Sequence, residues 1–275
     1  MKQFLLISLA SALLLTAGCS NDGIDSLSDP APLTLLTRGA TETTAAHRLL
    51  VFPASASGKT DDGGSNDDAD CLLNYSFTSG NALTLAAGSY RFVTLTESSC
   101  LDLPVAGKTD GLLFDKLLTL KGGASLEAVQ VSEPAEVTFP GTSSYTASLQ
   151  PATCLLKLQL TDAPEGLTLQ LTNMYGGIPL SGSYPKDAPV IAYSLHQGEN
   201  ICLPTGESAV LQYQYKEESE SGPASGIQSG TLNLGMSLDP GYTYSASLQW
   251  HNEELKITST VEKWQGNDNT TGDAE

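Results

Sequence analysis

Short segments in which apolar and polar residues alternate recur from residue 48 to residue 262, and they constrain the fold more than any other feature. A period of two places apolar side chains on one face of a β-strand. Turns rich in Gly, Ser and Pro separate the segments. The expected strands are 48–52, 72–78, 83–85, 90–95, 117–120, 128–131 and 136–139, then 154–160, 167–171, 189–194, 208–215, 230–234, 242–249 and 255–262. Because only residues 111–118 have helical character, the pattern predicts an all-β fold.

The expected strands form two successive series of similar length. Two such series, without intervening helices, are typical of two antiparallel β-sandwich domains in tandem and not of βαβ units. We therefore expect an N-terminal β-sandwich over residues 46–146 and a C-terminal β-sandwich over residues 147–265. The remaining residues, 266–275, form a polar tail.

The N-terminus carries a segment for export. Lys2 precedes an apolar run from Phe4 to Leu15, which is long enough for a signal peptide and too short to span a bilayer. The run ends in small residues before Cys19 and resembles the lipobox of bacterial lipoproteins, although Thr16 stands where Leu is usual. This predicts a signal peptide over residues 1–18 and lipidation of Cys19, whose acyl chains would hold the protein in the outer membrane. The alternative is an ordinary secretory signal with an incidental cysteine.

The charge balance argues against two classes of partner. The formal net charge is −18, and the predicted signal peptide contributes only the positive Lys2, so the exported chain is more acidic still. Such a surface repels nucleic acids and anionic lipids. Charged residues make up only 16% of the chain, which is too few for a disordered protein. We expect a folded protein that stands outside the cell and binds no nucleic acid.

Four cysteines remain after the lipidation site: Cys71, Cys100, Cys154 and Cys202. In an exported chain an even number indicates disulfides, and four cysteines allow three connectivities. Pairing Cys71 with Cys100 and Cys154 with Cys202 would keep each bond within one expected domain. The alternative is four free, buried thiols, which behave as small apolar side chains.

The remaining polar clusters do not predict chemistry. The loop Asp61–Asp70 is rich in oxygen ligands but lacks the spacing of a calcium-binding loop, so a solvated surface loop explains it better. His47, His196 and His251 are far apart in the sequence, and no nucleophile motif accompanies them. The neighbouring carboxylates of Glu217–Glu220 lie in a Gly- and Ser-rich loop. We predict no catalytic residue, no metal site and no cofactor, and we do not expect an enzyme.

Aromatic residues alternate along two late strands: Tyr213, Tyr215, Tyr242, Tyr244 and Trp250. One face of these strands is expected to form core. An exposed aromatic stripe would instead provide a surface on which glycan rings stack. The core interpretation is favoured.

Several short segments, taken in order, carry a resemblance to a known family. They are the predicted lipobox, Arg48–Phe52, Gly88–Val93, Tyr145–Leu149, Leu155–Leu160, Leu171–Tyr175, Gly182–Tyr184, Tyr242–Leu248, a turn at Asn252–Glu253, and Val261–Trp264. The chain resembles the fimbrillin-like lipoproteins of type V pili, especially their minor and anchor subunits. The resemblance covers most of the exported chain through loose strand patterns. It implies two transthyretin-like β-sandwiches, a cell-surface fimbria and a role in adhesion to host or bacterial surfaces.

The resemblance also implies assembly with other fimbrial subunits by β-strand exchange. In polymerising members a trypsin-like protease cuts after an Arg and frees the first strand. Arg38 could be that site, and residues 19–45 would form a tether with the N-terminal strand; the alternative is an ordinary linker Arg. Past Trp264 only polar residues remain, which favours an anchor or tip subunit over a stalk subunit. The alternative function is a glycan-binding surface lipoprotein of a polysaccharide-uptake system, which would use exposed aromatic residues.

Overall fold

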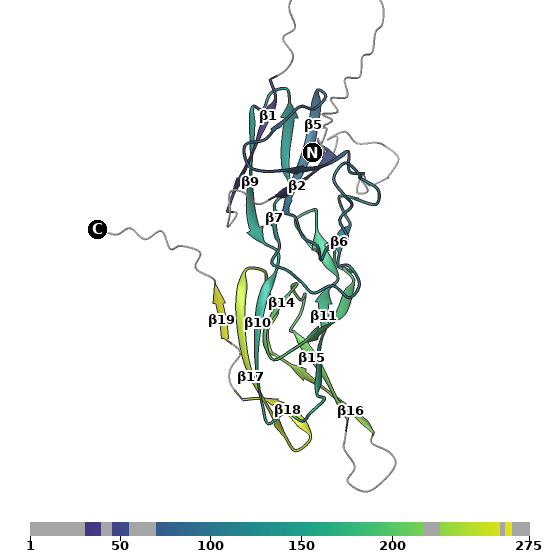
Figure 1. Cartoon of the computed structure of the whole chain (residues 1–275), viewed down its shortest axis with the longest axis vertical. Coiled ribbons are helices and arrows are strands. Elements are labelled where there is room, and N and C mark those ends of the chain that lie inside the picture. The colour runs from purple at the N-terminus through teal and green to yellow at the C-terminus, as the bar shows by residue number, and fades with distance from the viewer. Residues whose placement is uncertain (1–30, 40–45, 55–69, 217–225, 259–261, 266–275) are drawn as a thin grey trace, which may run out of the picture. The chain divides into compact units, whose positions relative to one another are not determined.

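The computed structural model describes residues 31–39, 46–54, 70–216, 226–258 and 262–265. In this part of the chain every regular element is a β-strand, which confirms the all-β prediction (Figure 1). The helical expectation for residues 111–118 was wrong, because they form turns and the start of a short strand. Eight residues are too few for a stable isolated helix, and the burial of Leu112, Phe114 and Leu118 decides their conformation instead. Within the described ranges, no helical segment has the length and apolarity needed to span a bilayer.

The first half of the described chain is a sandwich built from eight strands. They are β1 (Leu33–Arg38), β2 (His47–Pro53), β3 (Leu73–Phe77), β4 (Ala82–Leu83), β5 (Gly88–Thr96), β7 (Gln130–Ser132), β8 (Ala135–Phe139) and β9 (Ser144–Pro151). Strands β3, β2, β5 and β8 pair in that order, and β9, β1 and β4 form the second layer. Strand β7 pairs with both β5 and β9 and so connects the two layers through backbone hydrogen bonds.

The second half is a sandwich of two separate sheets. Its strands are β10 (Cys154–Thr161), β11 (Thr168–Tyr175), β13 (Val190–Leu195), β14 (Gly198–Cys202), β15 (Val210–Lys216), β16 (Ile227–Asn233), β17 (Tyr242–His251), β18 (Glu254–Ile257) and β19 (Glu262–Gln265). One sheet has the order β13-β11-β15-β16. The other has the order β14-β10-β17-β18, and β19 also pairs with β17.

The two halves repeat one pairing scheme. The sheet β3-β2-β5-β8 corresponds to β13-β11-β15-β16, and the layer β9-β1-β4 corresponds to β17-β10-β14. In each half the first strand lies beside the last long strand in the same direction, as β1 with β9 and as β10 with β17. All other described ladders are antiparallel. Strand β1 is therefore the counterpart of β10.

Strand β2 is buried on both faces, which explains its unbroken apolar sequence. Leu49 and Val51 face the core of the first sandwich. Leu50 and Phe52 face a second core that includes residues of the segment between β5 and β7. That second core continues into the second half, where it includes the interior side chains of β10, β11, β15 and β17. One apolar cluster therefore runs through both halves.

A short strand pair also joins the halves. Strand β6 (Leu117–Thr119) pairs antiparallel with β12 (Gly177–Pro179), with Gly177 opposite Thr119. A Cβ atom on Gly177 would lie 2.5 Å from the carbonyl oxygen of Leu118, so only Gly permits this approach. The junction thus depends on close backbone contact as well as on the shared core.

A buried polar network holds the segment that follows β5. Arg48 is almost fully buried. Its guanidinium donates hydrogen bonds to Asn74 Oδ1 at 3.0 Å and to the Pro104 carbonyl at 2.8 Å. It also forms an ion pair with Glu97. The Asn74 amide nitrogen donates in turn to the carbonyl of Lys108 at 2.7 Å. These hydrogen bonds satisfy carbonyls of a loop that has no sheet partner of its own.

His47 makes the stability of the first half depend on pH. Its side chain is 0% exposed, its ring packs edge-on against Phe77 at 5.7 Å, and neither ring nitrogen has a hydrogen-bond partner among the described residues. Burial lowers the pKa of His47 below 6.5, so the folded state binds the proton less readily than the unfolded state. We expect the free energy of unfolding to have its full value above pH 6.5. As the pH falls below 6.5, this free energy should decrease by up to about 1.4 kcal/mol per pH unit.

Urea unfolding at pH 7.5 and at pH 5.5 measures this dependence. His47→Leu should reduce the difference between the two pH values, whereas His196→Gln, at an exposed position, should leave it unchanged. An equal pH dependence in wild type and in His47→Leu would contradict the assignment.

Candidate functional site

Strand β1 lies inside a sheet and not at its edge, so its removal would open a slot. On one side it forms a parallel ladder with β9 that ends with Arg38 opposite Ser148. On the other side it pairs with β4 and with the turn that precedes β4. There the Leu35 amide donates to the Asn81 carbonyl at 2.8 Å, and the Gly80 amide donates to the Leu35 carbonyl at 2.7 Å. We call the space between β9 and residues 79–83, which β1 fills, the β1 slot.

Two side chains fix β1 in this slot. Leu33 and Leu35 are 0% exposed and belong to the core of the first sandwich, whereas Thr34 and Leu36 are only partly buried. This alternation matches a strand with one face on the core. The other buried members of the core are Leu49, Val51, Phe77, Leu83, Phe92, Val137, Phe139, Tyr145 and Ala147. Burial of one Leu side chain contributes about 1.5–3 kcal/mol, so two of them hold β1 firmly.

The covalent connections of β1 differ from those of its counterpart β10. Strand β10 follows β9 with only residues 152–153 between them, and β11 follows it, so β10 is tied at both ends to strands of the described fold. Strand β1 is joined to described strands only through residues 39–46, which lead to β2. One cut in that connection would break the covalent link between β1 and the sandwich that it completes, so that only noncovalent contacts would hold β1.

Arg38 and Gly39 form the end of β1 at this connection. Both residues are exposed, and Arg38 is still paired with β9. Gly39 has a φ of 85°, a conformation that favours glycine, and a Cβ atom there would lie 2.8 Å from the carbonyl oxygen of Leu149. Gln130 Nε2 donates a hydrogen bond to the Gly39 carbonyl at 3.1 Å. Sequence reasoning selected Arg38 but missed Gln130, which is remote in sequence and ordinary in type.

Several predicted sites lie wholly or mainly outside the described residues. These are the predicted lipidation site Cys19 with its signal peptide, the carboxylates of Glu217–Glu220, and the loop Asp61–Asp70 except for its last residue. The described residues contain no group of three His, Cys, Asp or Glu side chains placed to hold a metal ion.

The four predicted disulfide cysteines are buried free thiols in the structure. Cys154 and Cys202 lie directly opposite each other on the antiparallel strands β10 and β14, a placement whose backbone spacing suits a disulfide. Cys71 and Cys100 are not register partners of each other in any described ladder. Both pairings remain predictions.

We expect the thiols of Cys71, Cys154 and Cys202 to react very slowly in the native protein. Burial raises the pKa of Cys71 to about 11 and that of Cys154 to about 12, and it also raises the pKa of Cys202. At pH 8 little thiolate exists, so alkylation by iodoacetamide should be on the order of 100-fold slower than after unfolding in urea.

Mass spectrometry after alkylation in urea, without reductant, also counts the free thiols. Four alkylated cysteines among these residues would exclude the predicted disulfides, whereas two would indicate one bond. Rapid alkylation of the native protein would contradict the burial of these thiols.

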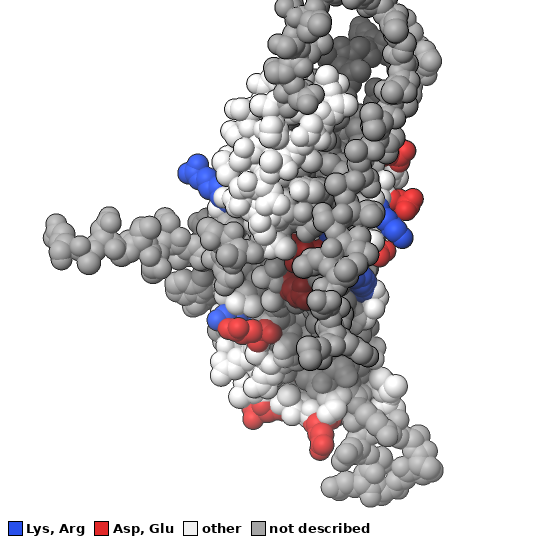
Figure 2. Space-filling view, turned by 45° about the horizontal axis from the view of Figure 1, so that its top comes forward, with Lys and Arg blue, Asp and Glu red and all other residues white. Residues whose placement is uncertain are grey.

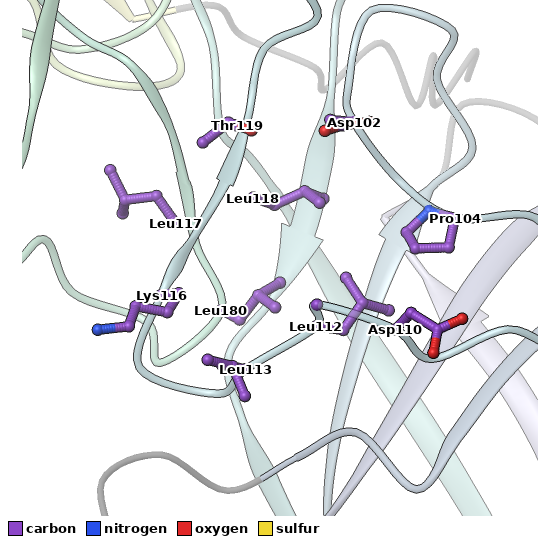
Figure 3. Close-up of a pocket in the computed structure, with 11 residues that line it drawn as sticks. Asp102, Pro104, Asp110, Leu112, Leu113, Lys116, Leu117, Leu118, Thr119 and Leu180 are labelled. Carbon is purple, nitrogen blue, oxygen red and sulfur yellow. The ribbon is translucent and has the colours of Figure 1, made fainter.

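One cavity lies beside the β6 strand. It has a volume of about 210 Å³, and five of its eleven lining residues are leucines (Figure 3). Figure 3 shows Leu112, Leu118 and Leu180 at its centre, with Asp110 and Lys116 toward its periphery. No aromatic side chain lines it, so the cavity lacks a platform on which a sugar ring would stack.

The aromatic side chains of β15 and β17 form core, as the sequence predicted. Tyr213, Tyr215 and Tyr244 are buried, and the first two pack edge-on against Trp250, at 5.7 and 4.6 Å. Tyr242 and Trp250 are partly buried. Every aromatic side chain whose burial the structure describes is buried or partly buried.

Charged side chains are sparse over the described part of one face (Figure 2). Figure 2 shows the basic side chains there as separate spots and not as a patch.

Comparison with known proteins gives the fold a context. No family model and no curated protein matches the sequence. A candidate polysaccharide-binding protein from Bacteroides thetaiotaomicron superposes with a TM-score of 0.54 at 13% identity, over 86% of this chain and 98% of that protein. A candidate adhesin from Bacteroides ovatus superposes with a TM-score of 0.53 at 15% identity, over 90% of this chain and 99% of that protein. These two likenesses establish a shared fold. The fimbrial anchor protein Mfa2 from Porphyromonas gingivalis is also similar, with a TM-score of 0.48 at 11% identity, over 85% of this chain and 97% of that protein.

Proposed function

We propose that the chain is a structural subunit of a cell-surface fimbria that joins its neighbours by β-strand exchange at the β1 slot. The observation that carries this proposal is the position of β1. It lies between β9 and residues 79–83, it buries Leu33 and Leu35, and it is joined to the described strands only through residues 39–46. A strand so placed can be replaced by an extended segment of another subunit that supplies the same backbone pairing and apolar side chains.

The exchange is confined to the first half of the chain. Strand β10 occupies the corresponding place in the second half, but it continues from β9 and leads into β11. It cannot leave its sheet without pulling one of these strands with it. Each subunit therefore accepts one incoming strand, which yields a linear assembly.

The proposed place of the subunit is at an end of the fimbria. Acylation of Cys19 would hold an uncut chain in the outer membrane as an anchor subunit, whose slot an incoming strand could enter only by displacing β1. Cleavage after Arg38 would instead release the chain from its lipid and suit a tip subunit. The shared fold with a candidate adhesin of Bacteroides ovatus supports a role in adhesion and does not select between these positions.

A peptide-binding experiment tests strand exchange directly. A protein of residues 40–275 lacks β1, and a synthetic peptide of residues 31–39 supplies it. We expect the shortened protein to bind this peptide saturably and to bind a scrambled peptide far more weakly, while residues 20–275 bind neither because β1 fills the slot. If the shortened protein is unfolded alone, refolding on addition of the peptide, followed by circular dichroism, reports the same binding. If the protein of residues 40–275 is folded but does not bind the peptide of residues 31–39, the proposal of strand exchange is refuted.

Mass spectrometry of shed fibres and of membranes tests the cellular role. Fibres should contain the chain, and its N-terminus distinguishes an acylated Cys19 from a new end at Gly39. If the chain never co-purifies with fibres and is retained on a polysaccharide matrix, the glycan-binding function takes the place of this proposal.

A further inference from the structure

We propose that the folded sheet protects the Arg38–Gly39 bond, so that cleavage there requires the end of β1 to detach from β9 first. This inference rests on the proposed function, in which release of β1 opens the slot. It concerns the regulation of that step: the first sandwich controls when its own strand can be cut.

The pairing of β1 is the first reason for protection. A trypsin-like protease binds its substrate as an extended strand and forms backbone hydrogen bonds to the residues before the cleaved bond. Here those backbone groups are already paired. The ladder with β9 runs through Thr37 to Arg38, and the Thr37 amide also donates to Ser79 Oγ on the other side, at 3.2 Å. Arg38 is exposed, but the strand that carries it is not free to enter a second sheet.

The conformation of Gly39 is the second reason. Its φ of 85° turns the chain away from the extended form that the protease needs beyond the cleaved bond. The hydrogen bond from Gln130 Nε2 holds Gly39 in this position, where a Cβ atom would lie 2.8 Å from the Leu149 carbonyl oxygen. Gln130 itself is fixed, because its backbone amide donates to Thr96 Oγ1 at 3.0 Å. Gln130 therefore acts as a latch between β7 and the end of β1.

Protection has a consequence for the order of events. A bond that is cut only from a detached state is cleaved at a rate set by the population of that state. Cleavage would occur before the first sandwich closes, or when an incoming strand competes for the slot. A completed subunit that meets no partner would keep its slot filled.

Limited trypsin digestion of residues 20–275 without denaturant tests the inference. The readout is the rate at which the new N-terminus at Gly39 appears in mass spectra, with cleavage after the exposed Lys121 as an internal reference. We expect cleavage after Arg38 to be at least about 100-fold slower than in a synthetic peptide of residues 31–45, which contains this single Arg.

Variants at Gln130 and at Ser79 sharpen the test. Gln130→Leu and Ser79→Ala each remove one hydrogen bond and should accelerate cleavage after Arg38 about five-fold, with no change after Lys121. Gln150→Leu is the matched control and should leave both rates unchanged. It changes an exposed Gln on β9 whose side chain has no hydrogen bond to any residue that the structure describes.

Two outcomes would overturn the inference. One is cleavage of the native protein after Arg38 at the rate of the peptide, and the other is an equal cleavage rate in wild type, Gln130→Leu and Ser79→Ala. Neither outcome depends on peptide binding by residues 40–275. Failure of protection and failure of strand exchange are therefore separate results.

Discussion

Replacement of Leu35 by Ala is expected to lower the free energy of unfolding by about 2–5 kcal/mol. Leu35 is fully buried in the core of the first sandwich, and β1 is paired on both sides, so the surrounding strands cannot collapse into the space that the lost atoms leave. Urea unfolding of residues 20–275 gives the change directly. The same substitution in the synthetic β1 peptide should weaken its binding to residues 40–275, because one side chain serves both interactions.

Leu36→Ala is the control for this prediction. Leu36 is the next residue of the same strand but is only partly buried and lies outside both buried clusters, so its truncation should cost less than about 1 kcal/mol. Equal losses for the two variants would show that β1 does not bury one specific face and would remove the basis of the proposed exchange.

Gly177→Val should disrupt the junction between the halves and cost several kcal/mol. A Cβ atom at this position would lie 2.5 Å from the Leu118 carbonyl oxygen and 2.9 Å from Thr119 Cα, and backbone atoms cannot move aside as a flexible side chain can. Strand β6 would have to separate from β12, which would expose part of the core that the halves share. We expect a lower Tm and faster proteolysis of the segment between β5 and β7.

Gly122→Ala is the matched control, because Gly122 lies three residues beyond β6 and a Cβ atom there would meet nothing within 4 Å. It should change Tm by little. Retention of the wild-type Tm by Gly177→Val would show that the β6–β12 pair contributes nothing to stability.

The sequence predicted the strands of this fold better than their partners. Alternation from Cys154 to Leu160 located β10 to within one residue, because each strand's period of two is a local property. It did not reveal that β1 and β9 run in parallel, since the paired residues are more than one hundred positions apart. Alternation shows which face of a strand is buried but not which strand lies beside it.

The candidate site was predicted only in part for the same reason. Arg38 followed from a family resemblance and from its place after an apolar patch. The latch could not be predicted, because a Gln on a short strand and a Gly in a linker are common and acquire meaning only when the fold brings Gln130 to Gly39. The helical expectation for residues 111–118 failed because burial of their apolar side chains outweighs local helical preference.

In a fibre built by the proposed strand exchange, the nearly uninterrupted run from β9 into β10 would form one continuous load-bearing stretch of backbone. An incoming strand in the slot would pair with β9, and only residues 152–153 separate β9 from β10, which is flanked by β14 and β17. Tension on a fibre built in this way would pass along one stretch of backbone from the neighbour's strand into the interior of the second sandwich. The ladder between the incoming strand and β9, and the ladders of β10 with β14 and β17, would then be loaded in shear. In shear, many backbone hydrogen bonds resist the force together instead of opening one after another.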